Sequence, residues 1–139
     1  MITALEPAGI GPILLDSSAL LALCLHEPGG EQVERAVGAS SHAYMTVTNV
    51  AESTSRLMRM GWTVPEVESA MTDLEIMVLP EDRSHGILAG ELHARTRGTG
   101  LSTGDAVCLA AAVREEWPVF TSDRAWATLD LGIPVILIR

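Results

Sequence analysis

Short runs of apolar residues that do not alternate with polar ones recur along the chain, separated by longer segments with helical spacing. A strand buried on both faces has this unbroken apolar pattern, whereas a strand with one solvated face alternates. We therefore expect an α/β fold, a three-layer α/β/α sandwich with a central, mainly parallel sheet. The expected strands are residues 13–15, 43–45, 76–79, 119–121 and 135–138.

Capping and breaking residues delimit the helices expected between these strands. Asp16 or Ser17 can cap the first helix, Thr46 or Thr48 can cap the third, and Pro65 stands at a first-turn position of the fourth. Glycines in the intervening segments favour turns. The expected helices are residues 17–25, 31–37, 48–60, 65–74, 82–97, 105–116 and 124–131.

The length of 139 residues suits one domain, and the chain shows no internal repeat or linker. We expect a single domain over residues 13–139. Residues 1–12 contain two prolines and two glycines and lack the basic and apolar regions of a signal peptide, so we expect a flexible arm and a cytoplasmic protein. No apolar run reaches the ~18 residues of a membrane-spanning helix, so no membrane partner is expected.

The charge balance excludes several kinds of chemistry. Eighteen acidic residues oppose nine basic ones, giving a net charge of −9, and all nine basic residues are arginine. The absence of lysine excludes a P-loop, Schiff-base catalysis and the lysine-assisted phospho-aspartate domains. A net-negative chain is a poor general binder of nucleic acid, so binding of RNA would need a local arginine patch, metal ions or both.

Cysteines and histidines do not suggest a zinc site. Cys24 and Cys108 each lie in an apolar helical run without a second ligand at the usual spacing, so we expect two buried thiols. His26 falls at the end of the first expected helix, where the helix dipole favours it. The other histidines are expected at surface or loop positions: His42, His85 and His93.

Four acidic residues stand where a parallel sheet forms its sites, beyond the carboxyl ends of the strands. Asp16 and Asp123 follow apolar strands, Asp105 opens a helix after a glycine-rich loop, and Glu52 lies on the helix after the second strand. Each has a plain structural alternative. The aspartates can be helix caps or turn residues, and Glu52 can pair with Arg56 four residues on.

Taken together, the four acids favour a metal site. Converging carboxylates repel one another unless a cation neutralises them or their pKa values rise. Oxygen ligands suit Mg²⁺ or Mn²⁺, which also bind phosphate oxygens.

The segments around these acids have a recognisable order and spacing. They are LLDSSAL at 14–20, NVAE at 49–52, LSTGDA at 101–106 and VFTSDRAW at 119–126. In this arrangement the chain resembles the PIN-domain nucleases, and most closely the VapC-type toxins of type II toxin–antitoxin pairs. The resemblance extends from residue 13 to the last residue.

The resemblance implies that Asp16, Glu52, Asp105 and Asp123 form the catalytic acidic cluster and hold one or two Mg²⁺ or Mn²⁺ ions. The implied activity is that of an endoribonuclease. It would hydrolyse phosphodiester bonds of RNA, typically tRNA or ribosomal RNA, by means of a metal-activated water. Two hydroxyl residues and one aromatic match positions that support the site: Ser18, Thr121 and Trp126.

The resemblance also implies two protein partners, a second copy of the chain and a small antitoxin that covers the cleft. Four arginines could line the cleft and bind RNA, or could be solvated helix residues paired with acids: Arg56, Arg59, Arg95 and Arg97. The alternative function is a catalytically silent PIN-like binding or scaffold module. An aspartyl-phosphate enzyme is disfavoured, because it needs a lysine and an acid where this chain has Ser18.

Overall fold

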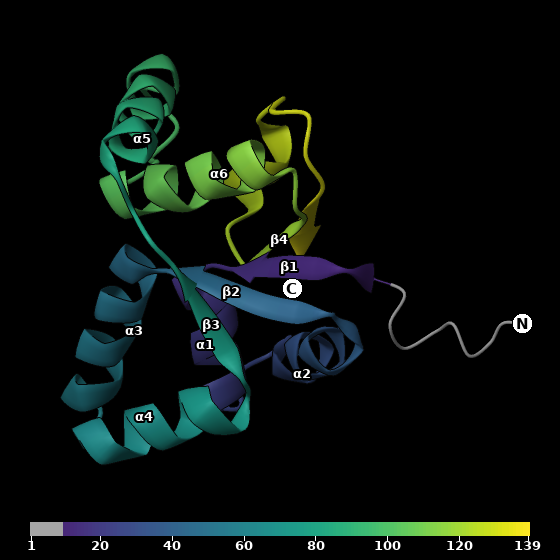
Figure 1. Ribbon diagram of the computed structural model, residues 1–139, viewed down its shortest axis with the longest axis vertical. Helices are drawn as coiled ribbons and strands as arrows, with labels where there is room; N and C mark the ends of the chain where they lie inside the picture. The colour runs from purple at the N-terminus through teal and green to yellow at the C-terminus, as the bar shows by residue number, and fades with distance from the viewer. Residues whose placement is uncertain (1–9) are drawn as a thin grey trace, which may run out of the picture.

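A five-stranded parallel sheet forms the middle layer of the computed structural model, which describes residues 10–139 (Figure 1). Its strands are β1 (Pro12–Leu15), β2 (His42–Thr46), β3 (Ile76–Leu79), β4 (Val119–Thr121) and β5 (Val135–Leu137). Every neighbouring pair is parallel and the order is β3-β2-β1-β4-β5. The chain therefore builds outward from β1 in both directions, and the strand order reverses between β1 and β4. The expected parallel sheet is confirmed.

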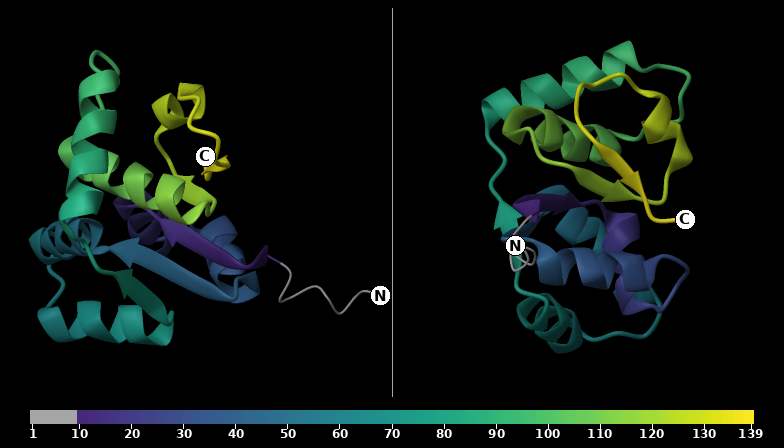
Figure 2. Two further views of the ribbon diagram at one scale, coloured as in Figure 1. Left: turned by 45° about the horizontal axis from the view of Figure 1, so that its top comes forward. Right: turned by 90° about the vertical axis from the view of Figure 1, so that its right-hand side faces the viewer.

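Helices cover both faces of the sheet, as the apolar strands predict. Figures 1 and 2 show α5 and α6 on one side of the sheet and α1 to α4 on the other. The helices are α1 (Ser17–Cys24), α2 (Gly30–Ala39), α3 (Val47–Arg59), α4 (Val64–Asp73), α5 (Arg83–Arg95) and α6 (Thr103–Glu115), and a 3₁₀ helix, η3, spans Arg124–Thr128. This last element is shorter than the expected helix 124–131.

Alternate residues of β1 face the two halves of the core. Ile13 and Leu15 pack into the cluster formed with α1 and α2, whereas Leu14 packs into the cluster with α6. All three are fully buried, and burying such a side chain stabilises the fold by about 1.5–3 kcal/mol. The strand that carries Asp16 at its end is thus fixed from both sides.

Small residues allow α5 and α6 to pack closely. Ala89 of α5 meets Ala106 and Ala110 of α6 in a buried cluster. His85 lies one turn before Ala89, so it shares this buried face. Its Nε2 is 2.9 Å from the carbonyl oxygen of Val107. The expectation of a surface position for His85 is wrong, because the helical period places residue 85 on the face that packs against α6.

Several other expectations are settled by the described residues. Cys108 is buried as expected, but Cys24 is only partly buried, at the last turn of α1. Strand β1 begins at Pro12, one residue inside the expected arm 1–12, while residues 1–9 of that arm lie outside the described part of the chain. Within residues 10–139, no helix is long and apolar enough to cross a membrane.

Candidate active site

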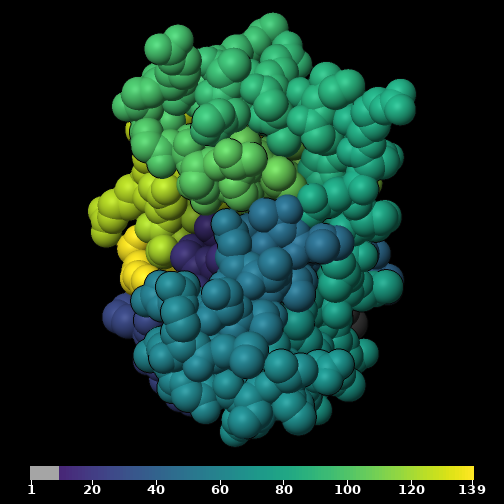
Figure 3. Space-filling view, turned by 90° about the vertical axis from the view of Figure 1, so that its left-hand side faces the viewer, coloured from purple at the N-terminus to yellow at the C-terminus, as the bar shows by residue number. Residues whose placement is uncertain are grey.

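The predicted acids lie at the carboxyl ends of β1 and β4, where the strand order reverses. Ligands in parallel sheets bind at such a position, because the connections leave in opposite directions and open a crevice. Figure 3 looks onto this edge. There the purple segment, the first described residues, is recessed between α3 (blue) and α6 (green), with the yellow-green β4–η3 segment at the border.

Asp16 is the most deeply buried of the four acids, with 5% of its surface exposed. It caps α1, and its Oδ1 accepts hydrogen bonds from the backbone N–H of Ala19 at 2.9 Å and the Ser18 hydroxyl at 2.7 Å. The Thr121 hydroxyl donates to Oδ2 at 2.7 Å. Capping and site position are therefore combined in one residue rather than being alternatives.

The hydroxyls of Ser18 and Thr121 also tie the end of β4 to the end of β1. Ser18 Oγ accepts from the backbone N–H of Ser122 at 2.9 Å. Thr121 Oγ1 accepts from the backbone N–H of Asp123 at 3.0 Å. Each hydroxyl thus bonds an Asp16 oxygen on one side and the β4 backbone on the other. The bond between Thr121 and Asp16 joins residues that are 105 positions apart in the sequence, and the bond between Ser122 and Ser18 joins residues 104 positions apart.

Burial raises the pKa of Asp16 from 3.8 to about 6, because the carboxylate loses its hydration. The hydrogen bonds from Ser18, Thr121 and Ala19 oppose this rise, and the charge of Asp105 adds to it. A carboxylate that is buried but not neutralised by a basic side chain is suited to receive a cation.

Asp105 lies in the first turn of α6, three residues after the capping residue Ser102. The two form a capping box. Asp105 Oδ2 accepts from the Ser102 backbone at 3.0 Å, and Ser102 Oγ accepts from the Asp105 backbone at 3.1 Å. The cap suggested at position 105 is therefore wrong, and Ser102 takes that role. Burial raises the pKa of Asp105, and the charges of Asp123 and Glu52 raise it further.

Asp123 caps the 3₁₀ helix after β4. Its Oδ1 accepts from the backbone N–H of Ala125 at 3.0 Å, and its backbone is held by Thr121. Three residues later, Trp126 is completely buried against Leu14, Leu109 and their neighbours. This anchor fixes the turn that presents Asp123, in agreement with the expected structural role of the tryptophan.

Glu52 reaches the site from the middle of α3. Its Oε1 accepts from the Ser17 hydroxyl at 3.0 Å and from Asn49 Nδ2 at 2.8 Å. The alternative pairing with Arg56 is not formed among the described residues. The helical spacing of Glu52 and Arg56 allows a pair, but Ser17 and Asn49 direct the carboxylate towards α1 and α6 instead.

Within residues 10–139, no basic side chain forms an ion pair with any of these four acids. Among residues 10–139 the ion pairs are Arg95–Glu91, Arg114–Asp82, Arg114–Glu115 and Arg139–Glu27. Four carboxylates that interact through their charges, without a counter-charge, form a donor set that fits Mg²⁺ or Mn²⁺. Within the same residues, no three acidic, histidine or cysteine side chains already stand at the spacing of one ion. An ion would have to draw them together.

The four arginines predicted at the rim differ in their contacts. Arg95 pairs with Glu91 at 2.6 Å on the exposed face of α5. Arg59 donates from Nε to the carbonyl of Ser55 at 3.4 Å. Arg56 and Arg97 are exposed, and within the described chain neither forms an ion pair. These two have guanidinium groups available for a phosphate.

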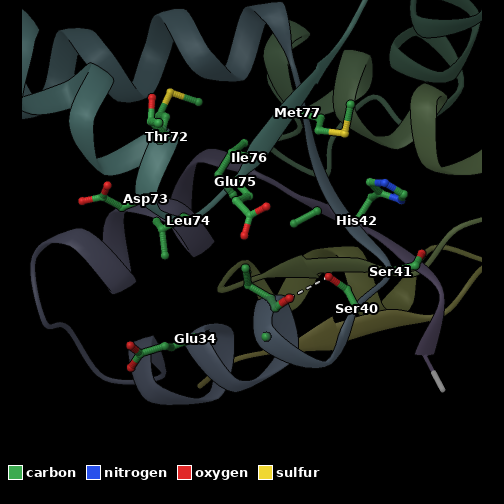
Figure 4. A pocket seen from close by; sticks show the side chains of 14 residues that line it. Glu34, Ser40, Ser41, His42, Thr72, Asp73, Leu74, Glu75, Ile76 and Met77 are labelled. Atoms are coloured by element: carbon green, nitrogen blue, oxygen red, sulfur yellow. Dashed lines mark hydrogen bonds between the residues drawn. The ribbon is translucent and has the colours of Figure 1, made fainter. Parts of the chain in front are cut away.

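A pocket of about 750 Å³ opens at the opposite end of the sheet (Figure 4). It lies between the carboxyl ends of α2 and α4 and the beginnings of β2 and β3. None of the predicted site residues lines it. The Ser40 hydroxyl donates to the Val37 carbonyl at 2.8 Å. Of the acids around the opening, Glu34 lies on α2, and Asp73 and Glu75 lie at the connection from α4 to β3. We assign it no chemical function.

Removing the Thr121 hydroxyl should loosen the site and the fold together. Thr121→Val deletes the bond to Asp16 and the bond from the Asp123 backbone, and leaves buried polar groups without partners. We expect a loss of about 1–3 kcal/mol in the free energy of unfolding, measured by urea denaturation. Thr121→Ser keeps the hydroxyl and is the matched control. A Thr121→Val variant as stable as the wild type would show that the hydroxyl bonds do not stabilise the fold.

Comparison with known proteins places this architecture in a family. A model of the PIN domain matches residues 13–131. The chain belongs to the PIN-domain family. No curated protein sequence matches the chain significantly.

Solved structures share the PIN-domain fold at low sequence identity. VapC20 of Mycobacterium tuberculosis, described as a toxin that cleaves the sarcin–ricin loop, has a TM-score of 0.67 and 17% identity, covering 88% of this chain and 99% of that one. A toxin–antitoxin complex from Klebsiella pneumoniae has a TM-score of 0.68 and 15% identity (88% and 96%). VapBC2 of Rickettsia felis, bound to a promoter DNA fragment, has a TM-score of 0.68 and 13% identity (90% and 98%).

Sequence reasoning did not assign a role to three residues of this PIN domain that touch Glu52. The sequence suggests Ser17 only as a possible cap, Asn49 only as part of the segment at 49–52, and Gly104 only as part of a glycine-rich loop. Their spacing gave one usable signal. Asn49 and Glu52 are three residues apart on a helix, so their side chains lie on the same face.

Proposed function

We propose that this PIN domain is an endoribonuclease that requires Mg²⁺ or Mn²⁺, and that it is the toxin of a type II toxin–antitoxin pair. The observation that carries the proposal is the group of four carboxylates at the strand-order reversal, with no basic partner among the described residues. A protein that only bound a partner would gain nothing from this repulsion, which costs stability unless a cation is present.

The residues of the candidate site would have three roles: binding the metal ion, positioning its ligands and binding RNA. Asp16, Glu52, Asp105 and Asp123 would hold the ion, and Ser18 and Thr121 would keep the buried Asp16 carboxylate in position. A bound divalent ion supplies positive charge to the phosphate oxygens and makes water a stronger acid. Arg56 and Arg97 would hold neighbouring phosphates of the RNA, since both guanidinium groups are free of ion pairs within the described chain.

The proposed RNA substrate is ribosomal or transfer RNA. The likeness to VapC20, a toxin described as cleaving the sarcin–ricin loop, supports RNA as the substrate class. The acidic total of the chain supports a local mode of binding through metal and arginine rather than a broad basic surface.

The proposed protein partners are an antitoxin and a second copy of the chain. The structures from K. pneumoniae and R. felis, a toxin–antitoxin complex and a VapBC protein, support an antitoxin partner. Large apolar side chains that are exposed in the single chain are consistent with protein interfaces. They include Val47, Met58, Met60, Val64, Met77, Val78 and Ile87.

The experiment that tests the function is cleavage of total RNA by the purified chain with Mg²⁺ or Mn²⁺. We expect cutting that stops on addition of EDTA and is absent from the Asp105→Asn variant. Mapping of the cut ends would then identify the RNA. A folded protein, free of antitoxin, that cuts nothing with either ion would contradict the proposal and favour the silent binding module.

A further inference from the structure

Gly104 stands at the second position of α6, where its backbone does not require a glycine. Its φ is not in the left-handed region, which is where glycine has an advantage over other residues. In a helix, alanine is favoured over glycine by about 1 kcal/mol. The chain therefore has a glycine where local stability favours alanine.

The space beside Gly104 is filled by the carboxylate of Glu52. A Cβ atom at position 104 would overlap Oε2 of Glu52 and would lie 2.9 Å from Cδ. Carbon atoms in contact are about 3.5–4.0 Å apart. The missing side chain is thus what allows the Glu52 carboxylate to approach the first turn of α6.

The other oxygen of Glu52, Oε1, would lie 3.0 Å from the same Cβ and accepts two hydrogen bonds. Ser17 Oγ and Asn49 Nδ2 donate to Oε1 at 3.0 and 2.8 Å. Asn49 is 2% exposed, so its amide has little freedom to turn. The Glu52 carboxyl group is therefore confined between two donors and the bare backbone of Gly104.

We propose that Gly104 is a positioning residue, whose missing side chain forms the seat that places the Glu52 carboxylate beside Asp105. The space that Gly104 leaves for the Glu52 carboxylate is a geometric feature of the fold. Its consequence for metal binding and catalysis rests on the proposed function. Glu52 lies on an exposed part of α3, so a methyl group at position 104 would turn its flexible carboxylate towards solvent. The fold would lose the hydrogen bonds from Ser17 and Asn49, and the site would lose one of its four acids.

The test is the Gly104→Ala variant. We expect a thermal midpoint within a few degrees of that of the wild type, because alanine favours the helix whereas the buried Asn49 amide loses its acceptor. We expect a crystal structure in which the Glu52 carboxylate has left its place beside α6. We expect Mn²⁺ affinity, measured by calorimetry, to fall about 10–100-fold, the usual effect of disturbing the support of a metal ligand. The kcat for RNA cleavage should fall more than KM rises, because the RNA-binding arginines are unchanged.

Two comparisons separate positioning from general damage. Gly90→Ala is the matched control, because Gly90 is also helical, is exposed and has open space at its Cβ. It should leave metal affinity and cleavage unchanged. In a Glu52→Gln background, Gly104→Ala should cause no further loss of metal affinity, since the carboxylate it displaces is already absent.

A shorter acid should partly restore the site. Glu52→Asp draws the carboxylate back from position 104, so Gly104→Ala combined with Glu52→Asp should bind Mn²⁺ more tightly than Gly104→Ala alone. The proposal is overturned if Glu52 keeps its place in the Gly104→Ala structure, or if Gly104→Ala weakens binding equally with and without Glu52. A wild-type chain that binds no Mn²⁺ would reject the proposed function instead, while the crystal structure would still decide whether the seat exists.

Discussion

In the absence of metal at pH 7.5, the Asp16→Asn variant is expected to be about 1–2 kcal/mol more stable than the wild type. In the presence of Mg²⁺ or Mn²⁺, the same variant is expected to have lost RNA cleavage by a factor of about 10³ or more. The stability gain arises because asparagine places no charge at this buried position. It can still accept the hydrogen bonds of Ser18 and Ala19. The gain is limited because the Thr121 hydroxyl loses a carboxylate acceptor.

The direction in which Asp16 makes stability depend on pH follows from the direction of its pKa shift. Because burial raises the pKa of Asp16 from 3.8 to about 6, the folded chain binds a proton more tightly than the unfolded chain does. The stabilisation is fully present below pH ~4 and is lost as pH rises through 6, an effect on the order of 3 kcal/mol. Between pH ~4 and ~7, the metal-free wild type should therefore lose stability more steeply than Asp16→Asn.

Urea unfolding across this pH range, with EDTA or with Mg²⁺, measures the effect. Mg²⁺ should stabilise the wild type above pH 6 and should have little effect on Asp16→Asn, since the ion binds the deprotonated folded site. Asp130→Asn, a substitution of an exposed acid after the 3₁₀ helix, is the control. It should change neither the pH dependence of stability nor the stabilisation by Mg²⁺. Identical pH profiles for wild type and Asp16→Asn would show that Asp16 is not the group whose burial is costly.

Trp126→Ala is expected to lower the free energy of unfolding by about 3–5 kcal/mol, the largest stability loss that we predict. The side chain is fully buried, so its removal leaves a cavity between β1, α6 and the 3₁₀ helix. Since typical domains are stable by only 5–15 kcal/mol, thermal unfolding should shift by many degrees.

Trp126→Phe is the informative companion variant. The indole Nε1 has no hydrogen-bond partner among the described residues, so phenylalanine removes no bond while keeping most of the volume. We expect a loss below about 1.5 kcal/mol and cleavage close to that of the wild type. Near-wild-type stability with abolished cleavage would contradict the structural role of Trp126 and point to direct contact with RNA.

The features that the sequence predicts well are those set by local pattern. Unbroken apolar runs predict a strand buried on both faces, and β4 has the predicted bounds, Val119–Thr121. Because parallel strands all end at the same edge, two aspartates that follow β1 and β4 can be placed near each other without knowledge of the structure. Chemistry at the carboxyl edge is thus predictable from the order of elements.

The features that sequence reasoning got wrong depend on which helix packs against which. His85 belongs to a polar-looking segment, and only the contact with α6 makes it a buried residue. For Asp105, both Ser102 and Asp105 are good caps, and the observed box uses one as the cap and the other in the first turn. Glu52 had a plausible partner in Arg56 one turn along the helix, but Ser17, far away in sequence, binds it instead.

The two hydroxyl bridges between β1 and β4 determine the stage of chain synthesis at which the site can form. Asp16 receives its Thr121 bond, and Ser18 its Ser122 bond, across more than a hundred intervening residues. Closing so long a loop carries an entropic cost that only the packed β4 strand can offset. A growing chain that has been synthesised up to the end of α6 already contains three of the four acids. It still lacks Thr121 and Ser122, which form these hydrogen bonds. The acidic group is therefore completed only after β4 and Asp123 have been synthesised and packed beside β1.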